Sequence, residues 1–194
     1  MYEFIKGIVA ELTPTYVVIE TGNMGYFINI SLQTYGHIGQ QKQVELWLHH
    51  IVREDTEQLY GFFEKEERSV FRLLIGVSGV GPNTARMILS SLSSAEVSAA
   101  IQQDNVRKLQ SIKGIGLKTA QRMVIDLKDK IGRATLSLSA TDSTGSFGQH
   151  EEALSALIML GFSKVPAEKA LQTLLRENAA YSTEELIKAA LKQL

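Results

Sequence analysis

Two short glycine turns contain the residues whose types and spacing could do chemistry. SGVGPNTA at 78–85 recurs as KGIGLKTA at 113–120, and each copy has Gly-aliphatic-Gly, two variable residues and Thr-Ala before a helical pattern. Glycine permits positive φ and leaves backbone N–H groups uncovered by a Cβ. The helix that follows adds unpaired N–H groups and the positive end of its dipole, which together bind phosphate well. The repeat therefore predicts a paired phosphate-binding site.

Side chains around the two turns extend this prediction. The aliphatic residue between the glycines is expected to point inward and anchor each turn, while Lys118 and Arg122 reach phosphate oxygens. The first copy has Asn83 and Met87 at the matching positions, so it depends more on backbone amides. The predicted DNA-phosphate-binding residues are Gly79, Val80, Gly81, Asn83, Thr84, Arg86, Gly114, Ile115, Gly116, Lys118, Thr119 and Arg122.

Other interpretations of a glycine-rich turn fit less well. A nucleotide-binding P-loop needs Lys and then Ser/Thr after its second glycine, and Pro82 and Asn83 stand there instead. A Rossmann fingerprint needs a preceding parallel strand, whereas the residues before Gly79 have helical spacing. The remaining alternative is that both turns only join helices, in which case the chain is a protein-interaction adaptor.

Charge is divided unevenly along a chain whose net charge is only −1. Residues 1–63 contain 3 Lys/Arg and 7 Asp/Glu, whereas residues 64–130, which include both turns, contain 11 and 7. The basic middle indicates an anionic partner. The absence of cysteine excludes a disulfide framework and thiolate chemistry. No apolar run reaches the roughly 18 residues that would span a bilayer, so we expect a cytoplasmic protein without a membrane partner.

Hydrophobic periodicity divides the chain into four parts. Five short strands with period-two alternation predict an N-terminal OB-type β-barrel, with an SH3-like barrel as the alternative. Helical spacing from Glu64, a Ser/Thr/Gly-rich stretch without periodicity and three amphipathic helices follow. The predicted fold class is α+β multi-domain, with the barrel at 1–63, a helical domain containing both turns at 64–131, a flexible linker at 132–148 and a three-helix bundle at 149–194.

Taken in order, these parts resemble the RuvA family of bacterial Holliday-junction-binding subunits. GVGPNTA and GIGLKTA are similar to tandem helix-hairpin-helix motifs, and IVREDTEQLYGF at 51–62 is typical of the family. The C-terminal helices, with MLGF at 159–162, resemble ubiquitin-associated (UBA-like) bundles. The resemblance covers the whole chain. It implies a non-catalytic subunit that binds four-way DNA in recombination, DNA repair and the SOS response to DNA damage.

The resemblance also implies partners and further site residues. It implies a homotetramer, with one or two tetramers on each junction, that recruits the RuvB ATPase through 149–194 and works with the RuvC resolvase. Glu54 and Asp55 correspond to an acidic pin that repels phosphates at the crossover, and Arg53 beside them is a further DNA contact. The apolar candidates for partner binding are Leu157, Leu160 and Phe162.

Catalytic and metal-binding patterns are weak in this sequence. His49 and His50 are adjacent in an expected strand, so their side chains face opposite ways and cannot share a metal. A helix-hairpin-helix DNA glycosylase needs an Asp after its hairpin, and Asp126 or Asp129 could supply it. Such enzymes also need a deep base pocket between helical subdomains, which a preceding barrel does not fit. We therefore expect no catalytic residue, no metal and no cofactor.

Overall fold

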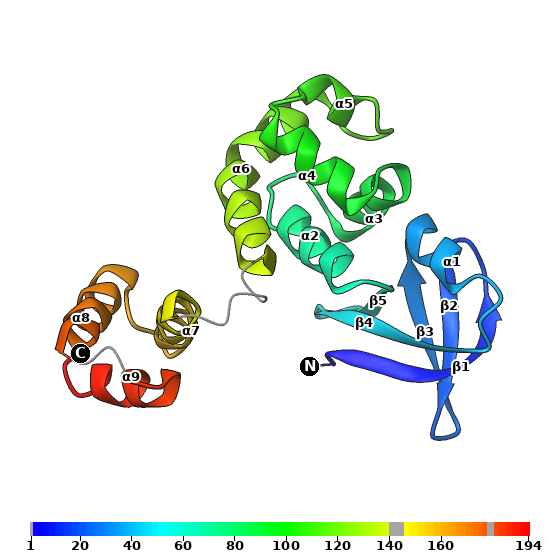
Figure 1. Cartoon of the computed structure of the whole chain (residues 1–194). Coiled ribbons are helices and arrows are strands. Elements are labelled where there is room, and N and C mark those ends of the chain that lie inside the picture. Colours follow the sequence, from blue (N-terminus) through cyan, green and yellow to red (C-terminus); the bar gives the residue numbers. More distant parts are fainter. Residues whose placement is uncertain (1, 140–145, 178–180) are drawn as a thin grey trace. The chain divides into compact units, whose positions relative to one another are not determined.

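The chain forms two compact units, which are described separately. The structure is a computed structural model that describes residues 2–139, 146–177 and 181–194 (Figure 1). The first unit, residues 1–133, contains a β-barrel and the helices that carry the glycine turns, and the second unit is residues 134–194. The barrel and the adjoining helices, which the periodicity separated at residue 63, therefore belong to one compact unit.

Five strands close into the N-terminal barrel. They are β1 (Phe4–Leu12), β2 (Tyr16–Thr21), β3 (Met24–Ile30), β4 (Gln43–Val52) and β5 (Glu57–Phe62). Their order is β1-β2-β3-β5-β4, with β4 returning to β1. Neighbouring strands are antiparallel except β3 and β5, which are parallel. This closed Greek-key order is the predicted OB-type barrel and not the SH3-like alternative. Its interior is filled by aliphatic side chains, among them Val17, Ile19, Ile28, Leu46 and Leu48.

A short helix, α1 (Leu32–Ile38), lies between β3 and β4, and the strand pattern of residues 1–63 did not predict it. The Ser31 hydroxyl caps its N-terminus by accepting from the Thr34 amide, and the helix ends at Gly39, whose φ is +51°. The glycine inside the segment lowers its helix propensity. The cap and the complete burial of Ile38 in the barrel core outweigh that penalty.

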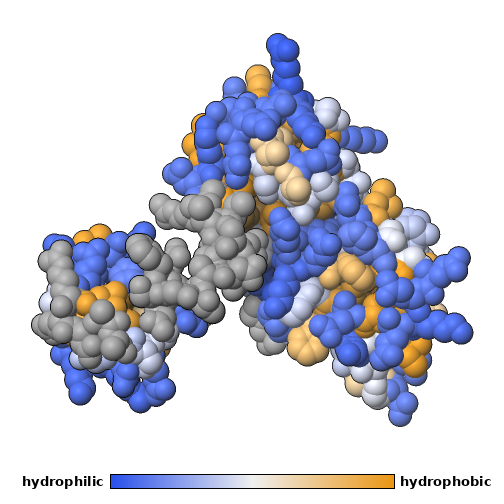
Figure 2. Space-filling model, in the orientation of Figure 1, coloured by the Kyte–Doolittle hydropathy of each residue, from blue (hydrophilic) through white to orange (hydrophobic). Residues whose placement is uncertain are grey.

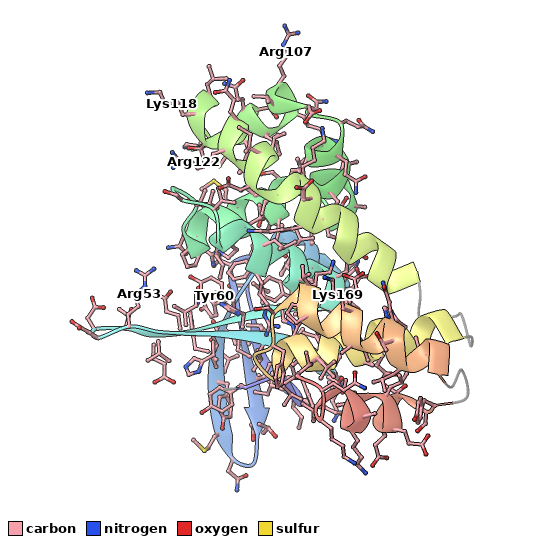
Figure 3. The ribbon with its side chains drawn as sticks, turned by 90° about the vertical axis from the view of Figure 1, so that its left-hand side faces the viewer. Arg53, Tyr60, Arg107, Lys118, Arg122 and Lys169 are labelled. Atoms are coloured by element: carbon pink, nitrogen blue, oxygen red, sulfur yellow. The ribbon has the colours of Figure 1, made fainter. Side chains whose placement is uncertain are left out.

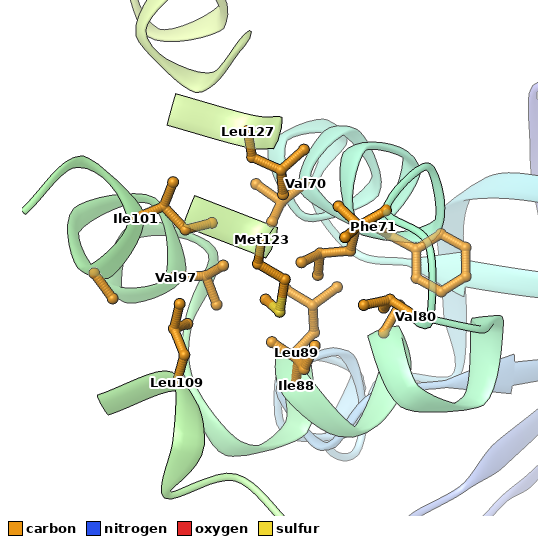
Figure 4. Close-up of a cluster of buried hydrophobic side chains, with 14 of the residues drawn as sticks. Val70, Phe71, Val80, Ile88, Leu89, Val97, Ile101, Leu109, Met123 and Leu127 are labelled. Atoms are coloured by element: carbon orange, nitrogen blue, oxygen red, sulfur yellow. The ribbon is translucent and has the colours of Figure 1, made fainter. Parts of the chain in front are cut away.

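The helices α2 to α6 form a second layer packed on the barrel (Figure 1). They are α2 (Lys65–Ile75), α3 (Pro82–Ser91), α4 (Ser94–Gln102), α5 (Val106–Gln110) and α6 (Leu117–Ser139). Figure 4 shows their apolar side chains meeting in one cluster, with Leu89, Met123 and Leu127 pointing toward one another. Tyr60 and Phe62 of β5 join this cluster, and their ring centroids lie 5.1 and 4.9 Å from that of Phe71. The shared core explains why barrel and helices form one unit.

Two adjacent buried charged residues of α2 also tie this helix to the barrel. Arg68 donates to the backbone oxygens of Glu3, at 2.9 Å, and Leu48, at 3.2 Å. Glu67 accepts from the hydroxyl groups of Ser31 and Thr34 at the start of α1. Burial raises the pKa of Glu67, and the two hydroxyl donors offset part of that effect.

The second unit contains α7 (Ser146–Met159), α8 (Lys164–Glu177) and α9 (Thr183–Ala190). Ser182 and Glu185 form a capping box at the start of α9. Gly161, with φ +101°, reverses the chain between α7 and α8. The three helices share an apolar core of their own, made of Ala153, Leu154, Leu157, Ala167, Ala170, Leu171, Leu174, Leu186 and Ala190.

Helices extend into the range that composition assigned to a linker. α6 continues to Ser139 and α7 begins at Ser146, so both overlap the expected linker at 132–148. Residues 140–145 of that expected linker lie outside the described residues. Low apolar periodicity indicates weak packing, but it does not prevent a helix from continuing for several residues.

Candidate nucleic-acid interface

The first glycine of each copy is required by a tight turn. In the first copy the Val80 amide donates to the Val77 oxygen at 3.0 Å, and Gly79 between them has φ +92°. In the second copy the Ile115 amide donates to the Ile112 oxygen at 3.1 Å, and Gly114 has φ +91°. A positive φ at the third of four hydrogen-bonded residues is the feature of a type II turn, which favours glycine there. The repeat in the sequence is therefore a repeat in backbone structure.

The second glycine of each copy starts a helix, and the fold does not require its lack of a side chain. Gly81 is the N-cap of α3 with φ −84°, a backbone conformation that does not require glycine. A Cβ built on Gly81 or Gly116 would meet no atom within 4 Å. No side chain caps α3 at Gly81. Its first amides are therefore left for an external acceptor such as a phosphate.

The aliphatic residue between the glycines anchors each turn, as predicted. Val80 and Ile115 keep only 4% and 6% of their surface exposed, and both belong to the core of the helical layer. Val80 points into that cluster in Figure 4. Each turn is thus held from below while its glycines face outward. Thr84 and Thr119, which follow in the first turns of α3 and α6, are half-buried.

Basic side chains near the second turn extend outward. Lys118 and Arg122 are exposed on α6 and point to the same side of the unit as Arg53 (Figure 3). Their spacing of four residues places them on one face of the helix. Lys113, the second residue of its type II turn, and Arg107 on α5 are also exposed, and neither was predicted from the sequence. The sequence signal that could have identified Lys113 is its position as the first residue of KGIGLKTA, where it aligns with Ser78 of the first copy.

Two predicted phosphate contacts of the first copy have partners on the barrel. Arg86 donates to the Thr15 oxygen at 2.8 Å and to Asn29 Oδ1 at 3.3 Å, so we remove it from the predicted phosphate contacts. Asn83 is exposed, and its Oδ1 lies 3.4 Å from the Tyr60 hydroxyl. Burial raises the pKa of Tyr60, so this hydroxyl stays protonated at neutral pH and donates to Gln58 at 2.9 Å.

The acidic pair lies in the hairpin between β4 and β5. Arg53 and Thr56 close its turn through a backbone hydrogen bond of 2.8 Å, and Glu54 and Asp55 lie between them. All four residues are exposed. Figure 3 shows the hairpin extending away from the barrel, with Arg53 near its tip. The carboxylates therefore project from the unit.

The histidines of β4 have separate partners, as their alternation predicted. His50 Nε2 lies 2.7 Å from Glu57 Oε1, while His49 Nδ1 accepts from Arg72 Nε at 3.3 Å. Burial, followed by the charge of Arg72, lowers the pKa of His49. Across residues 2–139, 146–177 and 181–194, no group of three His, Cys, Asp or Glu side chains is arranged to hold a metal.

The glycosylase alternative gains no support from the geometry. Asp126 and Asp129 are exposed on α6. A pocket of about 240 Å³ lies on the barrel and not between helices, and Lys6 is its charged lining residue. The other residues that line it are Tyr2, Phe4, Ile5, Thr21, Tyr26, Leu48 and Leu59.

The apolar residues of the second unit divide into core and surface. Leu157 is completely buried, so its prediction as a partner contact was wrong. Phe162 packs against the same core and is half-buried, whereas Leu160 is 60% exposed. Helical spacing alone did not separate these residues. Exposed apolar side chains beside Leu160 that were not predicted from the sequence are Ile158, Met159 and Val165.

Comparison with known proteins decides the family. Family models match the RuvA N terminal domain at residues 1–61, a SAM-like helix-hairpin-helix tandem at 71–129 and the RuvA C-terminal domain at 148–194. Proteins named Holliday junction branch migration complex subunit RuvA from Christiangramia forsetii, Bacteroides fragilis and Porphyromonas gingivalis are 48%, 47% and 45% identical to the chain. Each alignment covers 100% of both chains. The chain belongs to the RuvA family.

Membership in the RuvA family agrees with the architecture. The N-terminal match falls on the closed barrel, the tandem match contains both type II turns, and the C-terminal match falls on the second unit. The resemblance inferred from the glycine repeat and the 51–62 stretch is confirmed. In the part of the chain that the structure describes, no helix combines the length and apolar character needed to cross a bilayer.

Proposed function

We propose that this chain is the Holliday-junction-binding subunit of a branch migration complex and holds DNA by its phosphates. The full-length relatives bear that name. The observation that supports DNA binding most strongly is the pair of type II turns. Each turn is followed by a glycine on which a Cβ would meet no atom within 4 Å, and no side chain caps the helix that follows the first turn. Two such turns on one unit contact a duplex at two points and thereby define its direction. They contact the backbone and not base edges, so binding is independent of sequence.

The acidic hairpin gives the proposed subunit its preference for junctions. Glu54 and Asp55 are exposed at the end of a projecting hairpin, which suits contact with the open centre of a four-way junction. A continuous duplex places phosphates against these carboxylates and is repelled, whereas a junction has a gap between its arms. Arg53 at the base of the turn is placed to contact a strand that leaves this centre.

The proposal includes assembly into a homotetramer, with one or two tetramers on a junction. A four-fold arrangement matches the four arms of the DNA and gathers the acidic hairpins at its centre. Figure 2 shows hydrophobic side chains on the surface of the barrel, and Phe4, Ile8, Met24 and Phe27 are each more than half exposed. Native mass spectrometry with and without junction DNA measures both stoichiometries.

A gel-shift series tests the DNA-binding part of the proposal. The full chain is titrated onto a four-way junction, a linear duplex of the same length and a single strand, each at rising salt. We expect the junction complex to persist at salt concentrations that dissociate the duplex complex, because more phosphates are contacted. Equal affinity for junction and linear duplex would refute the proposed function, and cleavage or base release from any substrate would refute the absence of catalysis.

The second unit is proposed to recruit the RuvB motor ATPase, and the complex to serve a RuvC resolvase in the bacterial cytoplasm. Met159, Leu160 and Val165 are each more than half exposed and lie within a few residues of the reversal between α7 and α8. Because an exposed apolar group of this kind is stabilised by burial against a partner, Leu160→Ser should weaken stimulation of the ATPase and leave junction affinity unchanged. The matched control is Ile125→Ser on the first unit, where Ile125 is 77% exposed. Equal stimulation by both variants would contradict the assignment.

A further inference from the structure

The two turns differ in charge at every position where the second copy has a cation. Lys113, Lys118 and Arg122 of the second copy align with the uncharged residues Ser78, Asn83 and Met87 of the first. The first copy also begins α3 with Pro82, which has no backbone N–H to offer. By its own residues, the first turn therefore has fewer donors and no positive side chain for a phosphate.

The side chain of Arg122 crosses from the second copy to the first. Its Nη1 donates to the backbone oxygen of Ser78, at 3.4 Å, immediately before Gly79. Thr119, one turn earlier on α6, lies close as well, because a Cβ on Gly79 would be 3.8 Å from Thr119 Oγ1. The second turn has no matching neighbour from the first copy, since a Cβ on Gly114 would meet nothing within 4 Å. The start of α6 thus lies against the first turn.

We propose that Arg122 supplies the positive charge for the phosphate held by the first turn. This inference rests on the proposed function, because it concerns the same DNA. The Ser78 oxygen takes one of the five N–H donors of the guanidinium and holds the group beside the Ser78–Gly79 peptide of the first turn. The other donors are then available for phosphate oxygens, which guanidinium groups bind in a bidentate manner. Lys113 and Lys118 remain with the second turn.

This assignment explains how an uncharged first turn can contribute to binding. A phosphate at the first turn contacts the amides of α3 together with the guanidinium of α6. A phosphate at the second turn contacts the amides of α6 together with Lys118. The first site is thereby built from both copies, and its charge depends on the packing of α6 against α3.

Charge rescue at two matched positions tests the inference. Arg122→Gln keeps a polar, hydrogen-bonding side chain but removes the charge, and Lys118→Gln is its control at the second turn. Asn83→Lys then adds a cation at the first turn, and Leu117→Lys adds one at the second. Asn83, Leu117 and Arg122 are all exposed, so these changes leave the core intact. Affinity for the four-way junction is measured as a function of salt, with thermal unfolding as a check on folding.

We expect Arg122→Gln to reduce the slope of log affinity against log salt by about 0.9 for each phosphate that the variant no longer neutralises. Asn83→Lys should then raise junction affinity by about threefold more in the Arg122→Gln background than in the natural chain. Leu117→Lys should raise junction affinity equally in the two backgrounds. An equal gain from Asn83→Lys in both backgrounds, or a selective gain from Leu117→Lys, would overturn the inference. Failure of the natural chain to prefer the junction would instead overturn the proposed function.

Discussion

Arg86 of α3 donates to the backbone oxygen of Thr15 at 2.8 Å, although the two residues are 71 positions apart. A second bond, to Asn29 Oδ1 at 3.3 Å, fixes the same guanidinium against the barrel. Arg86 therefore fastens the helix of the first glycine turn to the strands. Its guanidinium is bound to the barrel, whereas the guanidinium of Arg122 contacts Ser78 of the first turn.

Replacing Arg86 should cost stability and spare the DNA contacts. Arg86→Met keeps an unbranched apolar stem and removes both hydrogen bonds, and we expect the free energy of unfolding to fall by about 1 kcal/mol. Trp47 is the single tryptophan and lies in the barrel, so its fluorescence during urea unfolding reports on the first unit. Lys42→Met, at an exposed position of the barrel, is the control. A reduced salt slope for junction binding, with stability unchanged, would show that Arg86 contacts phosphate after all.

Structure that depends on neighbouring residues was predictable from the sequence, whereas contacts between distant residues, such as those of Arg86, were not. Local signals predicted the five strands and both glycine turns, because each depends on residues only a few positions apart. The barrel partner of Arg86 and the approach of Arg122 to Ser78 depend on residues far apart in the chain. No spacing rule contains that information.

The two glycines of the first turn should respond to alanine in different ways. Gly79→Ala forces a side chain into a backbone with φ +92°, and we expect a loss of about 1–2 kcal/mol in the free energy of unfolding. Gly81→Ala meets no neighbouring atom at φ −84°, so it adds no strain, and its effect on stability should stay within about 1 kcal/mol, the cost of a poorer N-cap residue. Its added methyl group stands where a phosphate would approach the amides, and junction affinity should fall. Unchanged affinity in a stable Gly81→Ala variant would argue against a phosphate at this turn.

Neutralising the acidic hairpin should relax the preference for junctions. In Glu54→Gln/Asp55→Asn the two carboxylates no longer repel phosphates, so we expect linear duplex to bind more tightly while junction affinity changes less. The difference should shrink at high salt, because exposed charges are screened. Glu20→Gln/Glu45→Gln, at two exposed acids on β2 and β4 away from the tip, controls for the same change in net charge. If that control raises duplex affinity equally, the hairpin has no special role in excluding duplex.

Burial also separated residues that helical spacing had grouped. Leu157 and Leu160 both belong to the apolar pattern of α7, yet Leu157 is fully buried and Leu160 is 60% exposed. The helix ends at Met159, and the reversal at Gly161 turns Leu160 out of the periodic face. A difference of one or two residues in where a helix ends therefore determines which of its last apolar side chains is available to a partner.

The buried carboxyl of Glu67 should make the first unit less stable as pH rises from acid to neutral. Burial raises its folded-state pKa, and the hydroxyls of Ser31 and Thr34, with the charge of His37, lower it in part. The unfolded chain ionises first, near the ordinary pKa of about 4.3. The contribution of Glu67 is therefore complete below that value and is lost as pH rises through the higher folded-state pKa.

Glu67→Gln removes this titration and tests its sign. Urea unfolding followed by Trp47 fluorescence between about pH 4 and 7 should show the stability of the natural chain, relative to this variant, falling as pH rises. Glu66→Gln changes an exposed neighbour on the same helix and should leave the pH dependence nearly unaltered. A relative stability that instead rises with pH would mean that the hydroxyl groups of Ser31 and Thr34 stabilise the carboxylate more than burial destabilises it.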